Sequence, residues 1–352
     1  MSQEHSEATQ DYPIVVPSSA RHRMGQSLLA MAEKALRSRL SELLKNEKRT
    51  RAENDIEALH DMRVASRRLR EALRIYADLY SQKKLKQGKK DVRRVTRILG
   101  LVREVDVNVE QLKKWQGRLG EGYAIPVEYC LAMEQSRQRR LRKKMFAKLD
   151  EVDPDTLRAD LSKLLQHPHR LSRPREVEPG SELALSYVLF ARHFIEAGLG
   201  AIRSDVEAVS SKPTLHNYHR LRIQVKKFRY SLELLSRAFD SHRAVRILKQ
   251  LKSLQDELGA LHDCSVLHST VRAYRAQLRR SELSHLERQL LRLMRVLARA
   301  WSSQKKTIDS HLRRLALLRF FERIPTALKE EKSSPAIQST PEVPPVRIKA
   351  RH

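Results

Sequence analysis

Several features that mark common protein classes are scarce in this chain of 352 residues. Its two cysteines, Cys130 and Cys264, lie in no CxxC or zinc-ligand spacing, which argues against a disulfide framework and a zinc motif. No segment approaches the roughly 18 uninterrupted apolar residues of a membrane helix, and the N-terminus lacks the basic start and apolar core of a secretion signal. We therefore expect a cytoplasmic protein with no membrane partner.

Glycine, proline and aromatic residues are also few. The chain has 10 Gly, 13 Pro and 5% aromatic residues, and its long stretches rich in Leu, Ala, Arg, Lys and Glu repeat apolar positions three and four apart. This spacing predicts an all-α fold, because alternating strand patterns are absent. Clusters of proline indicate a linker and a tail. We expect disordered tails at 1–20 and 325–352, and a folded region 21–324 made of a half 21–165, a linker 166–180 and a half 181–324.

Positive charge is what the chain has in excess. Its 70 Lys and Arg residues against 42 Asp and Glu residues give a formal net charge of +28. Self-repulsion of this size usually indicates a polyanionic partner. The first 20 residues contain the acids Glu4, Glu7 and Asp11 and no Lys or Arg, so the excess charge belongs to the predicted folded region.

An internal repeat divides that region. The segment HDMRVASRRLR at 60–70 recurs as HRLRIQVKKFR at 219–229, and LGLVREVDV at 99–107 recurs as LGALHDCSV at 258–266. Both pairs have the same offset of 159 residues (219 minus 60, and 258 minus 99). The ungapped match predicts that both halves keep the same helix lengths and connecting turn. We expect two four-helix bundles packed side by side about a pseudo-twofold axis.

The first repeated motif forms a basic stripe on a helix. At about 100° per residue, the basic positions share an arc of roughly 80° opposite the apolar positions. Like charges three and four apart destabilise a helix by a few tenths of a kcal/mol per pair, so a stripe kept in both copies indicates a binding surface rather than a solvated face. Arg74 alone lacks a basic counterpart, being matched by Glu233. The stripe residues are His60, Arg63, Arg67, Arg70 and Arg74, and in the second copy His219, Arg222, Lys226 and Arg229.

The helix that follows each stripe, together with the second repeated motif at its end, adds further cations to the predicted groove. Glu104 follows Arg103, and Asp263 follows His262. We expect each of these acids to orient a neighbouring cation. We expect His60 and His219 near helix N-termini, where an anion is favoured, with affinity rising as pH falls through the histidine pKa. The added pairs are Lys90 with Lys249, Arg93 with Lys252, and Arg103 with His262.

Metal binding and nucleophilic catalysis are the rival interpretations of the histidines. The first-half counterparts of His216 and His262 are Glu57 and Arg103, so no complete metal site is duplicated, and the His262–Cys264 pair has no counterpart either. We expect no metal and no cofactor. The histidines considered are His167, His169, His216, His219 and His262.

The duplicated motifs resemble the CHAD family, named for a conserved-histidine α-helical domain, over roughly residues 21–324. The resemblance implies two pseudo-symmetric four-helix bundles around a basic cavity, binding of inorganic polyphosphate at polyphosphate granules, and no catalysis. Arg103 matches the family's later basic position, whereas His262 departs from it. The contacts that the resemblance implies are His60, Arg63, Arg67, Arg68 and Arg70, and His219, Arg222, Lys226, Lys227 and Arg229.

Two other functions compete with polyphosphate binding. A sequence pI of about 10.4 also fits a nucleic-acid-binding protein, but single-strand binders stack bases on aromatic residues, and Tyr230 is the lone aromatic candidate beside a stripe. An enzyme of polyphosphate metabolism would need a P-loop or a paired carboxylate motif, and neither is visible. We expect a non-enzymatic binding protein.

Overall fold

The computed structural model describes residues 18–53, 56–166, 182–239, 241–278, 283–317, 319–321 and 323–325. The predicted tails and linker lie largely outside these residues. Within them the regular elements are helical, as the sequence predicts. The main helices are α1 (Ser18–Glu53), α2 (Ile56–Ile75), α3 (Gln82–Gly100), α4 (Arg103–Gln116), α5 (Ala124–Asp150), α6 (Pro154–Leu165), α7 (Glu182–Ser211), α8 (Leu215–Leu234), α9 (Ser241–Leu278) and α10 (Ser284–Leu317).

The repeat offset is preserved in the helix boundaries. Helices α2 and α8 begin and end 159 residues apart, and so do the short 3-10 turns that follow them, Ala77–Leu79 and Ser236–Ala238. Helices α3 and α9 also begin at that offset. Both α2 and α8 bury their apolar side, with Leu69 and Phe228 at most 3% exposed. The predicted match of the first motif helix and its connecting turn is confirmed.

The second motif folds differently in the two halves, contrary to the predicted match. Helix α9 runs through it without a break, whereas the first half turns between α3 and α4 at Leu101 and Val102. The Leu101 N–H donates to the Ile98 carbonyl at 3.1 Å, closing a tighter turn than the α-helical one. Ala260 and Leu261 occupy these positions in α9, and leucine, the counterpart of Val102, favours helix more strongly than valine does. Together with the added α6, this break makes the first half differ from the predicted four helices.

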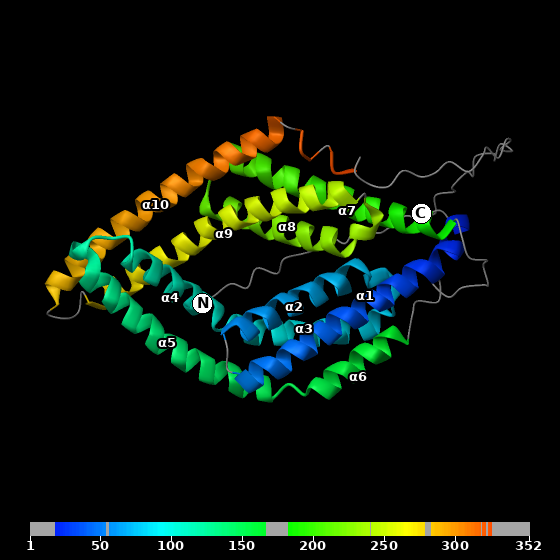
Figure 1. Ribbon diagram of the computed structural model, residues 1–352, viewed down its shortest axis with the longest axis horizontal. Helices are drawn as coiled ribbons and strands as arrows, with labels where there is room; N and C mark the ends of the chain where they lie inside the picture. Colours follow the sequence, from blue (N-terminus) through cyan, green and yellow to red (C-terminus); the bar gives the residue numbers. More distant parts are fainter. Residues whose placement is uncertain are drawn as a thin grey trace, which may run out of the picture.

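Corresponding helices of the two halves contact one another. The contacts join α1 to α7, α2 to α8, α4 to α9 and α5 to α10. In Figure 1, α1, α2, α3 and α6 form one side of an elongated molecule, α7 and α8 form the other, and α4, α5, α9 and α10 converge at one end. Helices α2 and α8, which carry the two basic stripes, therefore meet in the middle. The pseudo-twofold relation of the two bundles stays a prediction.

The buried clusters do not follow the division into halves. The larger cluster combines side chains of both, such as Leu69 from α2 and Phe228 from α8. A smaller cluster at the converging end combines Cys130 from α5 with Val271 from α9 and Leu290 from α10. The halves thus share their cores, which holds α2 and α8 in a constant relation. Among the described helices, none is long and apolar enough to cross a membrane.

Candidate functional site

Cations from both halves converge where α2 meets α8. Burial lowers the pKa of Lys226 and of Arg222 on α8, and the charges of Arg67 on α2 and Arg103 on α4 lower both further. Coulombic influence of this kind requires charges that lie close together, because it falls with distance and is screened by solvent. Residues that the sequence assigns to two separate motif copies therefore form one cluster. We call Arg63, Arg67, Arg103, Arg222 and Lys226 the central cationic site.

The central cationic site is strongly desolvated. Arg63 is 7% exposed, and burial together with the charges of Arg67 and Arg103 lowers its pKa to about 9. Burial and four neighbouring cations lower the pKa of Lys226 to about 7. Each shift means that the protonated form is disfavoured in the free protein. A bound polyanion would supply the missing negative charge and favour the protonated forms.

Two acids lie beside these cations without balancing them. The charge of Asp106 raises the pKa of Arg63, and that of Asp263 raises the pKa of Arg222, each partly offsetting the effect of burial. Asp106 was not assigned to the site from the sequence, because its counterpart in the repeat is Ser265. Five cations against two acids leave the site with a positive excess.

Glu104, one of the acids expected to orient a cation, contacts an arginine of α5. Its carboxylate accepts a hydrogen bond from Arg137 Nη2 at 3.1 Å. Arg137 also bonds to the fully buried Glu134 at 3.4 Å, so it links α4 to the core of α5. Arg137 itself has no repeat signal and was missed by the sequence analysis.

The second-half histidines meet at one side of the central cationic site. The Nδ1 atoms of His219 and His262 are 3.4 Å apart. Burial, Arg222 and His219 lower the pKa of His262 to about 4. Both histidines line an open cavity of about 950 Å³ between α5, α8 and α9, together with His216 and Arg140. Among the described residues, no group of three or more His, Cys, Asp or Glu side chains is placed to hold a metal ion.

Both motif histidines lie near the N-termini of their helices, as expected. His60 is the fifth residue of α2, as His219 is of α8. That first-turn N–H groups favour an anion at these histidines stays a prediction. Burial and the charges of Arg103 and Arg63 lower the pKa of His60. The histidine and the central cationic site thus influence each other.

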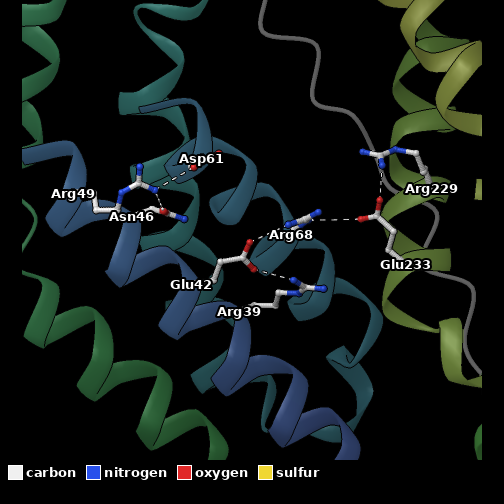
Figure 2. A network of polar contacts seen from close by, with 8 residues as sticks. All are labelled: Arg39, Glu42, Asn46, Arg49, Asp61, Arg68, Arg229 and Glu233. Atoms are coloured by element: carbon white, nitrogen blue, oxygen red, sulfur yellow. Dashed lines mark hydrogen bonds and ion pairs between the residues drawn. The ribbon is translucent and has the colours of Figure 1, made fainter. Parts of the chain in front are cut away.

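Other predicted contacts are engaged in ion pairs, one of which joins the two halves. Arg68 on α2 donates to Glu42 on α1 at 2.9 Å and lies 3.7 Å from Glu233 on α8, as Figure 2 shows. Arg229 pairs with the same Glu233 and donates to Gln255 at 2.8 Å. Glu233 therefore joins a motif arginine of each half, and this accounts for the acid that replaces the basic position of the first copy.

The first-half counterpart of Glu233 has a similar bridging role. Arg74 pairs with Glu71 at 2.5 Å and donates to the hydroxyl of Ser231 on α8 at 3.1 Å. Ser231 in turn donates to Glu71 at 2.7 Å. Arg74 thus helps to hold α2 against α8.

The remaining predicted contacts lie on or near the surface. The charge of Arg93 adds to burial in lowering the pKa of Arg70, so these two cations are neighbours across α2 and α3. Lys252 pairs with Asp256 at 2.6 Å, one turn along α9. Lys90 and Lys249 are exposed, and Lys227 is half-buried. Ligand contact at all these positions stays a prediction.

Comparison with known proteins places this arrangement in a family. The family model described as the CHAD domain matches residues 34–272, which is more than half of the chain. The chain belongs to the CHAD domain family. The repeated histidine and arginine helices that form the central cationic site lie within the matched residues.

Solved structures share the CHAD fold at low sequence identity. The crystal structure of the CHAD domain from the plant Ricinus communis is 20% identical, with a TM-score of 0.63, and the match covers 81% of this chain and 91% of that one. PptA from Streptomyces chartreusis is 15% identical, with a TM-score of 0.53, and covers 81% and 99%. Identities this low show the fold alone. No curated protein matches the chain.

Proposed function

We propose that this CHAD protein binds inorganic polyphosphate in the central cationic site. The observation that carries the proposal is the convergence of Arg67 and Arg103 from one half with Arg222 and Lys226 from the other. We call the cations of each half one wall of the site. A linear phosphate chain presents oxygens on every side, so one segment can contact both walls. Arginine offers paired donors to phosphate oxygens and lysine a point charge, which suits a polymer that adopts many poses.

Nucleic acid is the second candidate, and the surroundings of Tyr230 support it less. This tyrosine is 8% exposed, and the Arg229 guanidinium lies over its ring at 4.9 Å. A ring held in this way offers no free face to a base, whereas proteins that bind single strands generally stack bases on aromatic rings. The site therefore suits a polymer of phosphates without bases.

Binding without catalysis and residence at cytoplasmic polyphosphate granules are further parts of the proposal. Asp106 and Asp263, the acids beside the site, each raise the pKa of an arginine by their charge, as expected of groups that position cations. A long chain presents many phosphate segments to each molecule, and this multivalency keeps the protein with the bulk of its polymer. A protein held on its polymer in this way would reside where the polymer accumulates, in polyphosphate granules.

A titration with four ligands tests the proposed function. Long polyphosphate, orthophosphate, single-stranded DNA and single-stranded RNA are each added at about physiological ionic strength. We expect tight binding of polyphosphate alone, with affinity that falls steeply as salt rises, because released counterions drive binding to polyanions. Equal or tighter binding of either nucleic acid would contradict the proposal. Release of orthophosphate from the polymer would contradict its non-catalytic part.

A further inference from the structure

A second row of cations lies on the outer face of α10. Helix α10 follows an outer edge of the molecule and packs mainly on α9 (Figure 1). At about 100° per residue, the row occupies an arc of roughly 60°. At about 1.5 Å per residue it is about 38 Å long. The α10 row consists of the exposed residues Arg288, Arg292, Arg295, Arg299, Lys306 and Arg313.

The acids of α10 point away from this row. Glu287 pairs with Arg275 of α9 at 2.6 Å, and Asp309 accepts a hydrogen bond from the hydroxyl of Tyr218 of α8. These are the two acids between residues 284 and 317. Within the described part of the chain, the six cations of the α10 row make no ion pair. The outer face of α10 is therefore a continuous positive surface.

Some exposed cations on other helices are instead paired with acids of the same helix. Arg37 pairs with Glu33 at 2.8 Å, Lys114 with Glu110 at 2.6 Å, and Arg158 with Asp155 at 2.8 Å. Each pair lies within one turn of its own helix, which is the ordinary arrangement of a solvated face. The α10 row instead places like charges three, four and seven residues apart. That repulsion would be relieved by a polyanion lying along the helix.

The chemistry of the row identifies the kind of polyanion. The polar residues between its cations are the exposed serines Ser302, Ser303 and Ser310. The aromatic residue of α10, Trp301, packs against the larger buried cluster. The face thus offers donors to phosphate oxygens and no Phe, Tyr or Trp ring for a base. We propose that the α10 row binds a second segment of polyphosphate, so that one molecule bridges two polymer segments. This inference rests on the proposed function of the central cationic site.

A charge-matched pair of variants tests bridging. The row variant carries Arg292→Gln, Arg299→Gln and Lys306→Gln. The control variant carries Arg37→Gln, Lys114→Gln and Arg158→Gln, and it loses the same three charges from paired positions. Each protein is titrated with short polyphosphate to measure affinity, and with long polyphosphate to measure light scattering from cross-linked complexes. Duplex DNA and vesicles of acidic phospholipid are added in parallel.

We expect the row variant to keep the affinity of the central cationic site for short polyphosphate, and to lose at least about tenfold in scattering with long polymer. The control variant should scatter like the unmodified protein. Equal loss in both variants, or no loss in the row variant, would overturn the inference while leaving the proposed function intact. If the row variant loses binding to duplex DNA or vesicles but not scattering with polyphosphate, the inference would also be overturned. If the unmodified protein binds no polyphosphate at all, the proposed function itself fails.

Discussion

The two walls of the central cationic site have the same geometry and different charge chemistry. Arg67 and Arg103 on the first-half wall correspond, at the repeat offset, to Lys226 and His262 on the second. At neutral pH the arginines of the first half stay charged, including Arg63 with its pKa of about 9, whereas the pKa of Lys226 is lowered to about 7 and that of His262 to about 4. Equivalent helix positions thus carry arginine in one half and groups that titrate at or below neutral pH in the other. Near neutral pH one wall therefore supplies constant charge, and the other supplies charge that depends on pH.

The direction of the pH dependence follows from these shifts. In the free protein Lys226 is protonated below about pH 7 and neutral above it. A polyanion binds the protonated form more tightly and so raises the lysine pKa, and binding takes up a proton. Affinity is then highest below about pH 7 and falls as pH rises through that value. His262, neutral above about pH 4 in the free protein, changes affinity in the same direction at lower pH.

The largest expected effect comes from breaking both walls at once. Replacing Arg67 and Arg222 with alanine removes one half-buried guanidinium from each wall, and hydrogen bonds to charged groups contribute about 1.5–3 kcal/mol each. We expect affinity for short polyphosphate to fall at least about 100-fold, measured by calorimetric titration, with helicity unchanged by circular dichroism. The paired surface cations Arg37 and Arg158, replaced together, are the control. A loss no larger than that of the control would remove the two walls from the mechanism.

Making the second wall like the first should remove most of the pH dependence. Lys226→Arg combined with His262→Arg replaces both titrating groups with permanent cations. Between about pH 7 and pH 9 the unmodified protein should lose up to about tenfold in affinity per pH unit from Lys226, and the variant should lose much less. Short polyphosphate titrated over this range gives the comparison. Parallel pH curves for the two proteins would show that the lysine does not titrate in the binding reaction.

A smaller effect concerns the unequal residues Glu233 and Arg74. Glu233→Gln leaves Arg68 and Arg229 without their shared acid and should lower the free energy of unfolding by about 1–2 kcal/mol. Arg74→Ala should cost about 0.5–1 kcal/mol, because its side chain is 44% exposed whereas that of Glu233 is 20% exposed. Urea unfolding without ligand measures both. A larger loss for the arginine variant would contradict the linking role assigned to the acid.

The repeat made a large part of this structure predictable. A constant offset identifies α2 and α8 as equivalent helices, and their stripes and apolar faces follow from helical periodicity alone. It also indicated that Arg74 and Glu233 would make the halves unequal. The meeting of two stripes in one site follows once equivalent helices pack against each other.

Other features depend on contacts that no sequence period encodes. Arg68 looks like its neighbours in the motif, but an acid from α1 and another from α8 surround it. The break between α3 and α4 at Leu101 and Val102 falls inside matching motif positions, so the repeat alone does not predict it. The lowered pKa of His60 arises from burial and from Arg103 on another helix. Tertiary packing decides each of these.

Stoichiometry tests most directly whether both walls bind one polymer. Calorimetric titration with short polyphosphate is compared for the row variant of α10, in which the second proposed segment does not bind, and for that variant with Arg67→Ala or Arg222→Ala added. We predict one high-affinity site per molecule in all three proteins, with its affinity reduced by either added substitution. Two high-affinity sites in the row variant, with each added substitution abolishing one and leaving the other unchanged, would contradict a shared central cationic site.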